Sequence, residues 1–205
     1  MTTPAATIYV VDDDDAVRES LQALLESRGF AAAAYDSAEA FLAAYRPGGA
    51  ACALVDLRME GMDVIALLER LRADGIRLPV VLITGHGDVP VAVRAMKAGA
   101  ADFIEKPYSN ETLLASIARV LDAETATTGM SPEAAEAASR IAQLTPRERE
   151  VLDQLVLGHP NKIIAHHLDI SPRTVEIHRA NLMKKMQADS LSHLVRMALS
   201  AGVNG

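Results

Sequence analysis

Short apolar segments alternate with longer amphipathic segments along the first 121 residues. Runs of five or six residues, rich in small and β-branched side chains, are typical of strands buried in a sheet. Five such runs are Thr7–Asp12, Phe30–Tyr35, Ala51–Asp56, Pro79–Thr84 and Ala101–Glu105. The intervening segments repeat apolar residues every three or four positions, which is the spacing of one helix face. The pattern predicts five strands that alternate with five helices.

Residue types at the segment ends support this assignment. Ser37 and Ser109 stand where the second and fifth helices are expected to begin. Gly29, Gly75 and Gly99 stand where helices are expected to end in a left-handed cap. Strands that alternate with helices form βαβ units, in which the strands are parallel and helices cover both faces. We therefore expect an α/β fold with a five-stranded, parallel, doubly wound (flavodoxin-like) sheet.

The pattern changes after residue 121. Residues 122–139 are rich in Ala, Glu, Thr and Ser, and we expect a linker that is loose near its middle and helical toward Arg140. The rest of the chain has helical spacing throughout. The expected domains are residues 1–121, a linker at 122–139 and an all-α domain at 140–205.

Four helices are expected in the all-α domain. Thr145 and Glu148 form a predicted capping box at the start of the first helix, which ends before Gly158. The next helices are expected at residues 161–168, 172–186 and 191–199, with Ser171 as the cap of the longest. The second and third of the four helices form a predicted helix-turn-helix.

Charge is divided unevenly along the chain. The net charge is −7, but residues 1–139 carry −10 and residues 140–205 carry +3. An acidic first part and a basic second part favour different partners, and nucleic acid is a candidate for the basic part. Chance scatter of charge is the alternative until the cations can be placed on one face.

The sequence shows no signal for export or for membrane insertion. Residues 1–6 lack a basic start, and no apolar run approaches the roughly 18 residues of a membrane span. The one cysteine, Cys52, is expected to fill a core and cannot form a disulfide within the chain. These features suit a reducing compartment, so the expected location is cytoplasmic, with no membrane partner.

Polar residues stand at the ends of four predicted strands. Asp12 and Asp13 end the first, Asp56 ends the third, Thr84 ends the fourth and Lys106 follows the fifth. The carboxyl ends of parallel strands meet at one edge of the sheet, where ligands bind. Carboxylates gathered there repel one another unless a divalent cation lies among them, and Mg²⁺ prefers such oxygen ligands. The group predicts phosphoryl transfer to Asp56, with Mg²⁺ and Lys106 neutralising the transferred oxygens.

Each of these residues also has an ordinary structural explanation. Asp commonly ends strands and begins turns. Acidic residues at a helix start are favoured by the helix dipole, and we prefer that explanation for Asp14 and Asp15. Thr84 could simply end its strand, and Lys106 could be a surface lysine. The agreement of four strand ends favours the functional interpretation.

Residues 7–121 resemble the receiver domain of bacterial response regulators. The motifs are Val11-Asp12-Asp13, Val55-Asp56-Leu57-Arg58-Met59, Ile83-Thr84-Gly85-His86-Gly87-Asp88 and Phe103-Ile104-Glu105-Lys106-Pro107. The last two, with Met96-Lys97-Ala98-Gly99-Ala100, are most similar to the FixJ-type subgroup. The resemblance implies that Asp56 is the phosphoacceptor and that Asp13, Asp56 and the Arg58 backbone carbonyl bind Mg²⁺. It also implies that Asp12 positions the metal waters, that Thr84 and Phe103 form a switch, and that Lys106 contacts the phosphoryl group.

The segment after Asp56 departs from the family pattern. The family usually has Pro four residues and Gly eight residues after the acceptor, where this chain has Glu60 and Val64. A β-branched residue such as Val64 is strained at a positive φ, so we expect the loop to turn differently. Glu60 adds negative charge near the site and bears on metal affinity and on the lifetime of the phosphoryl group. We expect phosphorylation to persist, because the reacting groups are intact.

The helix expected at residues 172–186 has two distinct faces. At about 100° per residue, Val175, Leu182 and Met186 share a core stripe. The opposite face carries Arg173, Glu176, Ile177, Ala180, Asn181 and Lys184. These side chains can contact phosphates, hydrogen-bond base edges or touch a thymine methyl group. An ordinary charged surface helix is the alternative.

Further residues complete the candidate DNA-binding set. His178 and Arg179 flank the core stripe, so a backbone phosphate is their expected target. Lys162 and Lys185 are further phosphate candidates, and Thr174 lies at the helix start. Residues 142–203 resemble the LuxR/NarL-type DNA-binding domain. The motifs are Leu144-Thr145-Pro146-Arg147-Glu148-Arg149-Glu150-Val151-Leu152, Gly158, Asn161-Lys162-Ile163-Ile164-Ala165 and Ser171-Pro172-Arg173-Thr174-Val175-Glu176-Ile177-His178.

Together the resemblances imply a two-component response regulator, which is not an enzyme. A sensor histidine kinase is expected to phosphorylate Asp56, after which receivers dimerise and bind double-stranded DNA half-sites about one helical turn apart. RNA polymerase is a further expected partner. One alternative is a degenerate receiver that acts without phosphorylation, motivated by Glu60 and Val64. Another is an aspartate-nucleophile phosphatase of the haloacid dehalogenase type, but no acidic pair follows Lys106-Pro107 and the basic helices would be unexplained.

Overall fold

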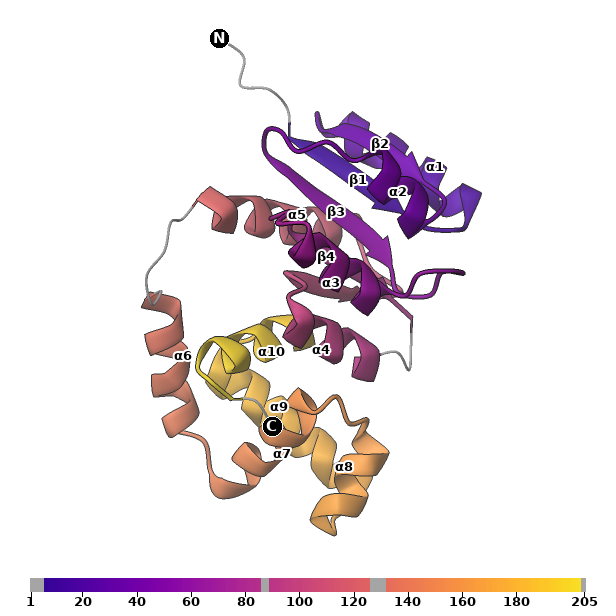
Figure 1. The fold of residues 1–205 in the computed structure, drawn as a ribbon. Coiled ribbons are helices and arrows are strands. Elements are labelled where there is room, and N and C mark those ends of the chain that lie inside the picture. The colour runs from indigo at the N-terminus through magenta and orange to yellow at the C-terminus, as the bar shows by residue number, and fades with distance from the viewer. Residues whose placement is uncertain (1–5, 86–88, 126–131, 204–205) are drawn as a thin grey trace. The chain divides into compact units, whose positions relative to one another are not determined.

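The computed structural model describes residues 6–85, 89–125 and 132–203 (Figure 1). The strands are β1 (Thr7–Val11), β2 (Ala31–Tyr35), β3 (Ala51–Asp56), β4 (Val80–Thr84) and β5 (Asp102–Glu105). The first helices are α1 (Asp15–Ser27), α2 (Ala38–Ala44), α3 (Val64–Ala73), α4 (Val89–Ala98) and α5 (Asn110–Thr125). They are followed by α6 (Pro132–Ala142), α7 (Pro146–Val156), α8 (Asn161–Leu168), α9 (Pro172–Met186) and α10 (Leu191–Ser200). None of the helices in these ranges is long and apolar enough to cross a membrane.

The chain forms two compact units. One comprises residues 1–86 and 98–126, and the other comprises residues 87–97 and 127–205. Helix α5 continues to Thr125, so the first residues of the expected linker are helical. Helix α6 covers the last residues of the expected linker and continues through Arg140, in agreement with the helix expected toward that residue. The middle of the expected linker, at 126–131, lies outside the described residues.

The five strands form one parallel sheet in the order β2-β1-β3-β4-β5. This order is that of flavodoxin-like doubly wound folds, and it confirms the predicted fold class. The observed strand limits differ from the predicted ones by at most one residue. Pro79, for example, precedes β4 because proline has no N–H for the ladder.

One face of the sheet is covered by α1 and α5. Successive side chains of a strand point to opposite faces, and Leu54 and Ile83 belong to the face that packs against Leu25 of α1 and Leu113 of α5. Cys52 is fully buried in the same core, which confirms its predicted role as core filler.

Aromatic side chains join α2 to the other face of the sheet. Phe41 of α2 is fully buried, and its ring centroid lies 5.5 Å from that of Tyr9 in β1. The ring centroid of Tyr45 lies 5.3 Å from that of Tyr9, and the ring centroid of Tyr35 lies 5.7 Å from that of Phe41. All seven aromatic residues of the chain precede residue 109. Tyrosine signals therefore report on the first unit and not on α6–α10.

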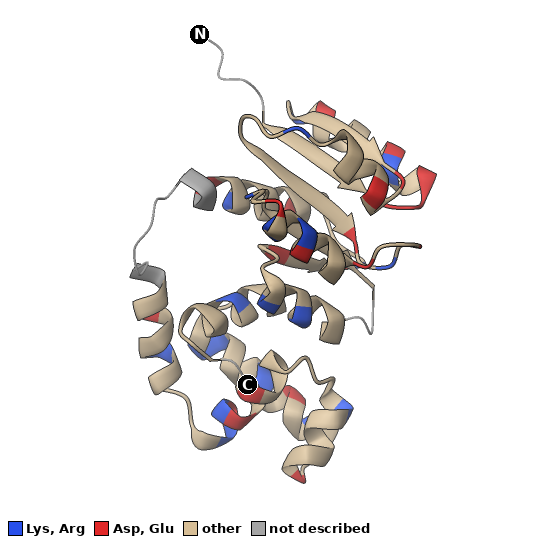
Figure 2. Cartoon of the chain, viewed as in Figure 1, with Lys and Arg blue, Asp and Glu red and all other residues tan. Residues whose placement is uncertain are grey.

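Helix ends have the predicted chemistry. Gly29, Gly75 and Gly99 have φ values of 86°, 69° and 112°, which confirms the left-handed caps. Asp14 caps α1, because its carboxylate accepts hydrogen bonds from Ala16 N and Val17 N at 2.9 and 3.2 Å. Acidic residues therefore gather where α1 begins (Figure 2).

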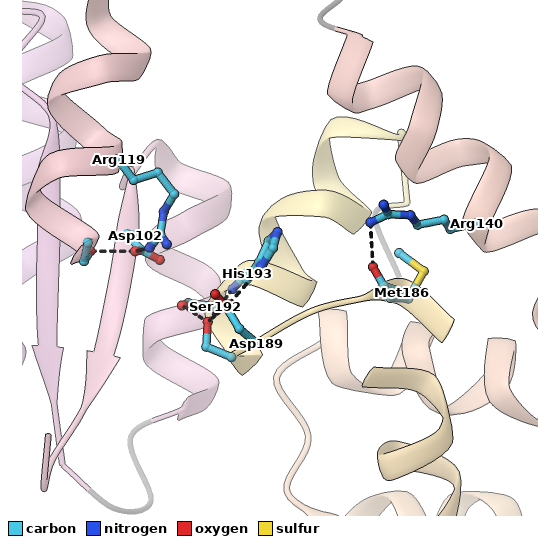
Figure 3. Close-up of polar contacts among 9 residues, drawn as sticks. Asp102, Arg119, Arg140, Met186, Asp189, Ser192 and His193 are labelled. Atoms are coloured by element: carbon cyan, nitrogen blue, oxygen red, sulfur yellow. Dashed lines mark hydrogen bonds and ion pairs between the residues drawn. The ribbon is translucent and has the colours of Figure 1, made fainter. Parts of the chain in front are cut away.

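A buried polar group at the start of β5 has no counterpart in the sequence-based predictions. Asp102 is fully buried and accepts a hydrogen bond of 2.6 Å from the Ser116 hydroxyl of α5 (Figure 3). It also forms an ion pair with Arg119 of the same helix. A buried carboxylate is tolerated only with such partners, so this group ties α5 to the edge strand.

Helices α7–α10 enclose one apolar core in the second unit. Val175, Leu182 and Met186 of α9 have no exposed surface, which confirms the predicted core stripe. Helices α8 and α9 form the expected helix-turn-helix, and the hydroxyl of Ser171 accepts a hydrogen bond from Thr174 N at 3.0 Å. The four expected helices are all present, and the last extends one residue beyond its predicted end.

The capping box of α7 is tied to the end of α9. Glu148 N donates to Thr145 Oγ1 at 3.3 Å, and Thr145 N donates to Glu148 Oε2 at 2.8 Å. The same oxygen accepts a hydrogen bond of 2.7 Å from Lys185 of α9, although Glu148 is only 4% exposed. Burial alone raises the pKa of Glu148, but the hydrogen bonds from Lys185 and Thr145 outweigh it and lower that pKa.

We expect Glu148→Gln to lower the free energy of unfolding of the second unit by about 1–3 kcal/mol at neutral pH, because Lys185 loses its counter-charge. The folded-state pKa of Glu148 is lowered. Its contribution is therefore complete above the unfolded-state pKa of about 4.3 and is lost as the pH falls below that value. The difference in the free energy of unfolding between Glu148→Gln and the parent protein should become smaller below about pH 4.

Urea unfolding followed by far-ultraviolet circular dichroism measures this change. A helical transition without a change in tyrosine fluorescence reports the second unit. Glu150→Gln is the matched control, because it removes an exposed carboxylate that pairs with Arg147. Equal effects of the two substitutions at neutral pH would contradict the role of Glu148.

Candidate functional site

The carboxylate of Asp56 lies at the end of β3 and contacts a lysine. Lys106, which follows β5, donates from Nζ to Oδ1 of Asp56 at 2.6 Å, and Arg58 N donates to Oδ2 at 2.7 Å. Burial alone lowers the pKa of Lys106, but the Asp56 hydrogen bond and the nearby negative charges raise it above its ordinary value. The structure thus brings the predicted acceptor together with a protonated lysine.

Asp12 adds a second buried carboxylate at this edge of the sheet. It is 3% exposed, and its Oδ1 accepts a hydrogen bond from Asp14 N at 2.9 Å. Its Oδ2 has no hydrogen-bond partner in the described part of the chain and lies 4.0 Å from Lys106 Nζ. Burial raises the pKa of Asp12, and the negative charge of Asp56 also raises it. One ammonium therefore serves two buried carboxylates.

Asp13 differs from these two residues because it is exposed. Within ranges 6–85, 89–125 and 132–203, no three or more His, Cys, Asp and Glu side chains are grouped so that they could hold a metal ion. The predicted ligand set also includes the backbone carbonyl of Arg58, so it is not composed of side chains alone. Mutual repulsion opposes a tighter cluster of carboxylates that have no cation between them.

The two predicted switch residues lie in neighbouring strands. Thr84 is fully buried at the end of β4, and its hydroxyl donates to the Gly85 carbonyl at 3.3 Å. Phe103 of β5 is 3% exposed and pairs in register with Leu82 of β4. The remainder of the Thr84 motif, His86-Gly87-Asp88, lies outside the described residues.

The loop after Asp56 turns at Gly61. Gly61 has a φ of 89°, whereas Val64 is the first residue of α3. The Asp63 carboxylate caps this helix by accepting a hydrogen bond from Ala66 N at 2.8 Å. Val64 therefore avoids the strained conformation. This finding agrees with the expectation that the loop turns differently from the family pattern.

Glu39 holds this loop, a role that the sequence pattern does not reveal. Glu39 lies in the first turn of α2, and its Oε1 accepts a hydrogen bond of 3.0 Å from Met62 N. A Cβ atom placed on Gly61 would lie 3.0 Å from the same oxygen. The two residues of the hydrogen bond are 23 positions apart, so local spacing carries no signal for it.

The predicted DNA-facing side of α9 is open to solvent. Ile177 is 52% exposed, although Val175, two residues earlier, is fully buried. The exposed set is Arg173, Glu176, Ile177, Ala180, Asn181 and Lys184. All six residues predicted for this face are thus placed together on the exposed side, while the core stripe faces the other helices.

Lys185, a predicted phosphate contact, has a partner within the fold. This residue was expected to contact a phosphate, but its ammonium forms an ion pair with the buried carboxylate of Glu148 at 2.7 Å. Breaking a pair with a buried carboxylate is costly, so the lysine is retained by the fold. Local spacing on α9 could not reveal a partner that lies 37 residues earlier.

Other predicted phosphate contacts have mixed surroundings. Lys162 of α8 is exposed, and His178 is half-buried. Arg179 donates from one guanidinium nitrogen to Asn161 Oδ1 at 2.6 Å, which joins α9 to the start of α8. The hydroxyl of Thr174 lies 2.8 Å from that of Ser171 in the cap of α9. Lys162 is therefore the phosphate candidate best placed to meet DNA.

Two family models match these two parts of the chain. The response regulator receiver domain matches residues 8–118, and the LuxR family of bacterial regulatory proteins matches residues 142–198. The chain belongs to the response regulators. Its receiver is joined to a LuxR-type DNA-binding domain, as the sequence motifs predicted.

Relatives of the FixJ type match nearly the whole chain. The transcriptional regulatory protein FixJ of Bradyrhizobium diazoefficiens is 48% identical over 201 residues, which are 98% of each protein. FixJ of Azorhizobium caulinodans is 52% identical over 197 residues, covering 96% of this chain and 93% of the relative. The crystal structure of full-length FixJ from B. japonicum has a TM-score of 0.57, with 48% identity over 96% of this chain and 97% of that chain.

These similarities establish the class of function. The chain is a two-component response regulator that regulates transcription through a LuxR-type DNA-binding domain. Proteins of this type are transcription factors and not enzymes, which sets aside the phosphatase alternative.

We expect Asp12→Asn to raise the free energy of unfolding of the receiver by roughly 1 kcal/mol at neutral pH without added metal, the order of the cost of a buried polar atom without a partner. The substitution removes a buried charge, and its amide oxygen can still accept the Asp14 hydrogen bond. The folded-state pKa of Asp12 is raised. The ionised form therefore costs stability above that pKa, and the cost disappears as the pH falls below the unfolded value.

Urea unfolding in the presence of a chelator, followed by tyrosine fluorescence, measures this gain. The gain should be largest at neutral pH and should narrow at acidic pH. Asp74→Asn is the control, because it removes an exposed carboxylate that pairs with Arg70. A variant less stable than the parent at neutral pH would be inconsistent with this account of Asp12.

Proposed function

We propose that a sensor histidine kinase transfers a phosphoryl group to Asp56, and that the phosphorylated receivers pair and bring two α9 helices to DNA. The 2.6 Å contact between Asp56 and Lys106, close to a buried Asp12 oxygen without a hydrogen-bond partner in the described residues, carries this proposal. An acceptor carboxylate with this charge pattern suits a phosphoryl group that arrives with a divalent cation.

The reaction proposed is a displacement at phosphorus. An oxygen of the Asp56 carboxylate forms a bond to phosphorus while the bond from phosphorus to the kinase histidine nitrogen breaks, and the bonding electrons remain on the imidazole. The Lys106 ammonium stabilises negative charge on the transferred oxygens. The N–H of Arg58 donates to the carboxylate and thereby orients it.

The residues at this edge fit Mg²⁺ as a cofactor. Asp12 offers a buried carboxylate oxygen without a hydrogen-bond partner in the described residues. Asp13, Asp56 and the Arg58 carbonyl would supply further hard oxygen ligands of the kind that Mg²⁺ prefers. When bound, Mg²⁺ offsets the negative charge shared by the carboxylates and the phosphoryl oxygens.

The later steps follow from the two-domain organisation. We assign residues 1–121 to the receiver, 122–139 to the linker and 140–205 to the DNA-binding domain. Phosphorylation repositions Thr84 and Phe103, and two receivers then form a homodimer. Two recognition helices bind half-sites about one DNA turn apart. The DNA-bound dimer then contacts RNA polymerase, the expected protein partner. Bacterial DNA lies in the cytoplasm, which is the proposed location.

We expect Asp56→Asn to abolish phosphoryl incorporation from a small phosphodonor in the presence of Mg²⁺, because an amide oxygen is a poor nucleophile and leaves no stable acyl phosphate. Intact-protein mass spectrometry measures the incorporation, and size-exclusion chromatography with light scattering measures dimer formation. Asp74→Asn, which removes an exposed carboxylate on the same unit, should be phosphorylated and should dimerise as the parent does.

A receiver that acts without phosphorylation is the second candidate. Glu60 favours it, because this residue adds a negative charge in the loop that follows Asp56. Glu60 is exposed, so its charge is hydrated and screened more strongly than that of Asp12. Absence of phosphoryl incorporation into the parent protein, or normal dimerisation of Asp56→Asn with phosphodonor, would support this second candidate.

We expect Lys162→Ala to weaken binding to all DNA sequences and to lower the slope of log affinity against log salt by about 0.9, the value for one lost phosphate contact. Lys185→Ala should instead destabilise the second unit, because Glu148 loses its partner, and should leave the slope unchanged. Fluorescence anisotropy with a duplex selected from a random library measures both slopes. A lower slope with Lys185→Ala would instead support the predicted phosphate contact of that residue.

A further inference from the structure

Helix α6 precedes the part of the chain that the LuxR family model covers, yet it belongs to the same core. The match to the LuxR family begins at residue 142, whereas α6 begins at Pro132. Ala137 is fully buried, and Ile141 is 7% exposed within the core of α7–α10. Helix α6 therefore packs with α7–α10 in the second unit, although the family match does not include most of it.

Arg140 of α6 contacts the end of the recognition helix. One guanidinium nitrogen donates to the Met186 carbonyl at 2.9 Å (Figure 3). A second guanidinium nitrogen donates to Gln187 Oε1 at 2.8 Å. The second nitrogen also pairs with Glu136, one turn earlier in α6, at 2.6 Å. The Arg140 side chain is 21% exposed. One partly buried guanidinium thus bridges α6 and the last residue of α9.

The contact meets two needs of a helix C-terminus. The last carbonyls of a helix lack partners within the helix, and Arg140 supplies a donor to that of Met186. A cation there also interacts favourably with the helix dipole. Gln187, which ends the helix, has a φ of 54°, a left-handed conformation that is costly for any residue other than glycine. The hydrogen bond to its side chain helps to hold that conformation.

The same turn of α9 is held from a second side. Lys185 forms its ion pair with Glu148 of α7. The end of the recognition helix is therefore fixed to α6 and to α7, next to the exposed Lys184 and about one turn beyond the exposed Asn181. A base contact depends on the position of such side chains to within about 0.5 Å. Phosphate contacts tolerate more displacement, since they carry no direct sequence information.

We propose that Arg140 is a positioning residue for DNA reading, and that α6 acts through it as a brace that sets the position of the C-terminal half of α9. Arg140 does not itself contact DNA in this assignment. Its loss leaves the phosphate contacts in place and misplaces the base contacts. The inference rests on DNA binding by the LuxR-type domain and does not depend on phosphorylation of Asp56.

The test uses the full chain, with a duplex selected from a random library by the parent protein and a scrambled duplex of equal length. We expect Arg140→Ala to weaken binding to the selected duplex roughly ten-fold, the equivalent of about 1.4 kcal/mol. Binding to the scrambled duplex should change by less than about two-fold, and the salt slope should stay within about 0.3 of the parent, well below the change for one phosphate contact.

Two further variants separate positioning from general instability. Arg140→Lys keeps the charge but not the planar two-nitrogen fork, so its affinity for the selected duplex should be intermediate. Gln187→Ala removes one acceptor of the fork. Combined with Arg140→Ala, it should weaken binding by less than the product of the two single effects, because the two residues share one interaction. Thermal unfolding confirms that each variant is folded at the assay temperature.

Matched controls and hydrogen exchange complete the test. Arg147→Ala removes an exposed arginine that pairs with Glu150 on α7, and it should leave the ratio of selected to scrambled affinity unchanged. The amides of Gln187 and Ala188, which donate to Lys184 O at 3.2 Å and Met183 O at 3.0 Å, should exchange faster in Arg140→Ala than in the parent.

Two outcomes would overturn the proposal. Equal weakening on both duplexes with a slope lowered by about 0.9 would make Arg140 a phosphate contact. Unchanged affinity for the selected duplex in a folded Arg140→Ala variant would make α6 a passive part of the linker. If Arg140→Ala does not fold, parent-like binding by both Arg140→Lys and Gln187→Ala would equally overturn it.

Discussion

The contact between Lys106 and Asp56 is the interaction on which the receiver site depends. Two carboxylates, one directly after β1 and one at the end of the adjacent strand β3, are buried at one edge of the sheet. The single ammonium lies 2.6 Å from Asp56 and 4.0 Å from Asp12. The aliphatic core and the buried Asp102 group stabilise a sheet that holds these like charges together. The site therefore has one cation for two buried carboxylates. A further cation would stabilise it, as suits an acceptor for a phosphoryl group that arrives with a metal ion.

The sequence was sufficient for the elements and for the meeting of Asp12, Asp56 and Lys106 at one edge of the sheet. Strands and helices have different periods, and the carboxyl ends of parallel strands necessarily meet. It was not sufficient for side-chain partners that are remote along the chain. Glu39 and Met62, Glu148 and Lys185, and Arg140 and Met186 are 23, 37 and 46 residues apart. Local spacing cannot reveal such partners, so the ion pair of Lys185 and the hydrogen bonds of Arg140 were not predicted.

The recognition helix is held along its length by polar contacts that leave its reading face open. Ser171 caps its start, Arg179 joins its middle to Asn161 of α8, and Lys185 joins its last turn to Glu148 of α7. A binding surface held in place before the ligand arrives loses less conformational entropy on association. The exposed side chains of α9 can therefore act as a preformed surface, and the accuracy of reading depends on residues that never reach the DNA.

The turn at Gly61 also bears on how this receiver can vary in sequence. A positive φ and the nearby Glu39 oxygen both disfavour a Cβ atom at position 61, whereas Val64 adds a buried aliphatic side chain to the start of α3. The requirement for glycine thus belongs to the turn and not to a fixed distance from the acceptor. Position 64 can therefore hold an apolar residue that adds to the core, whereas position 61 requires glycine.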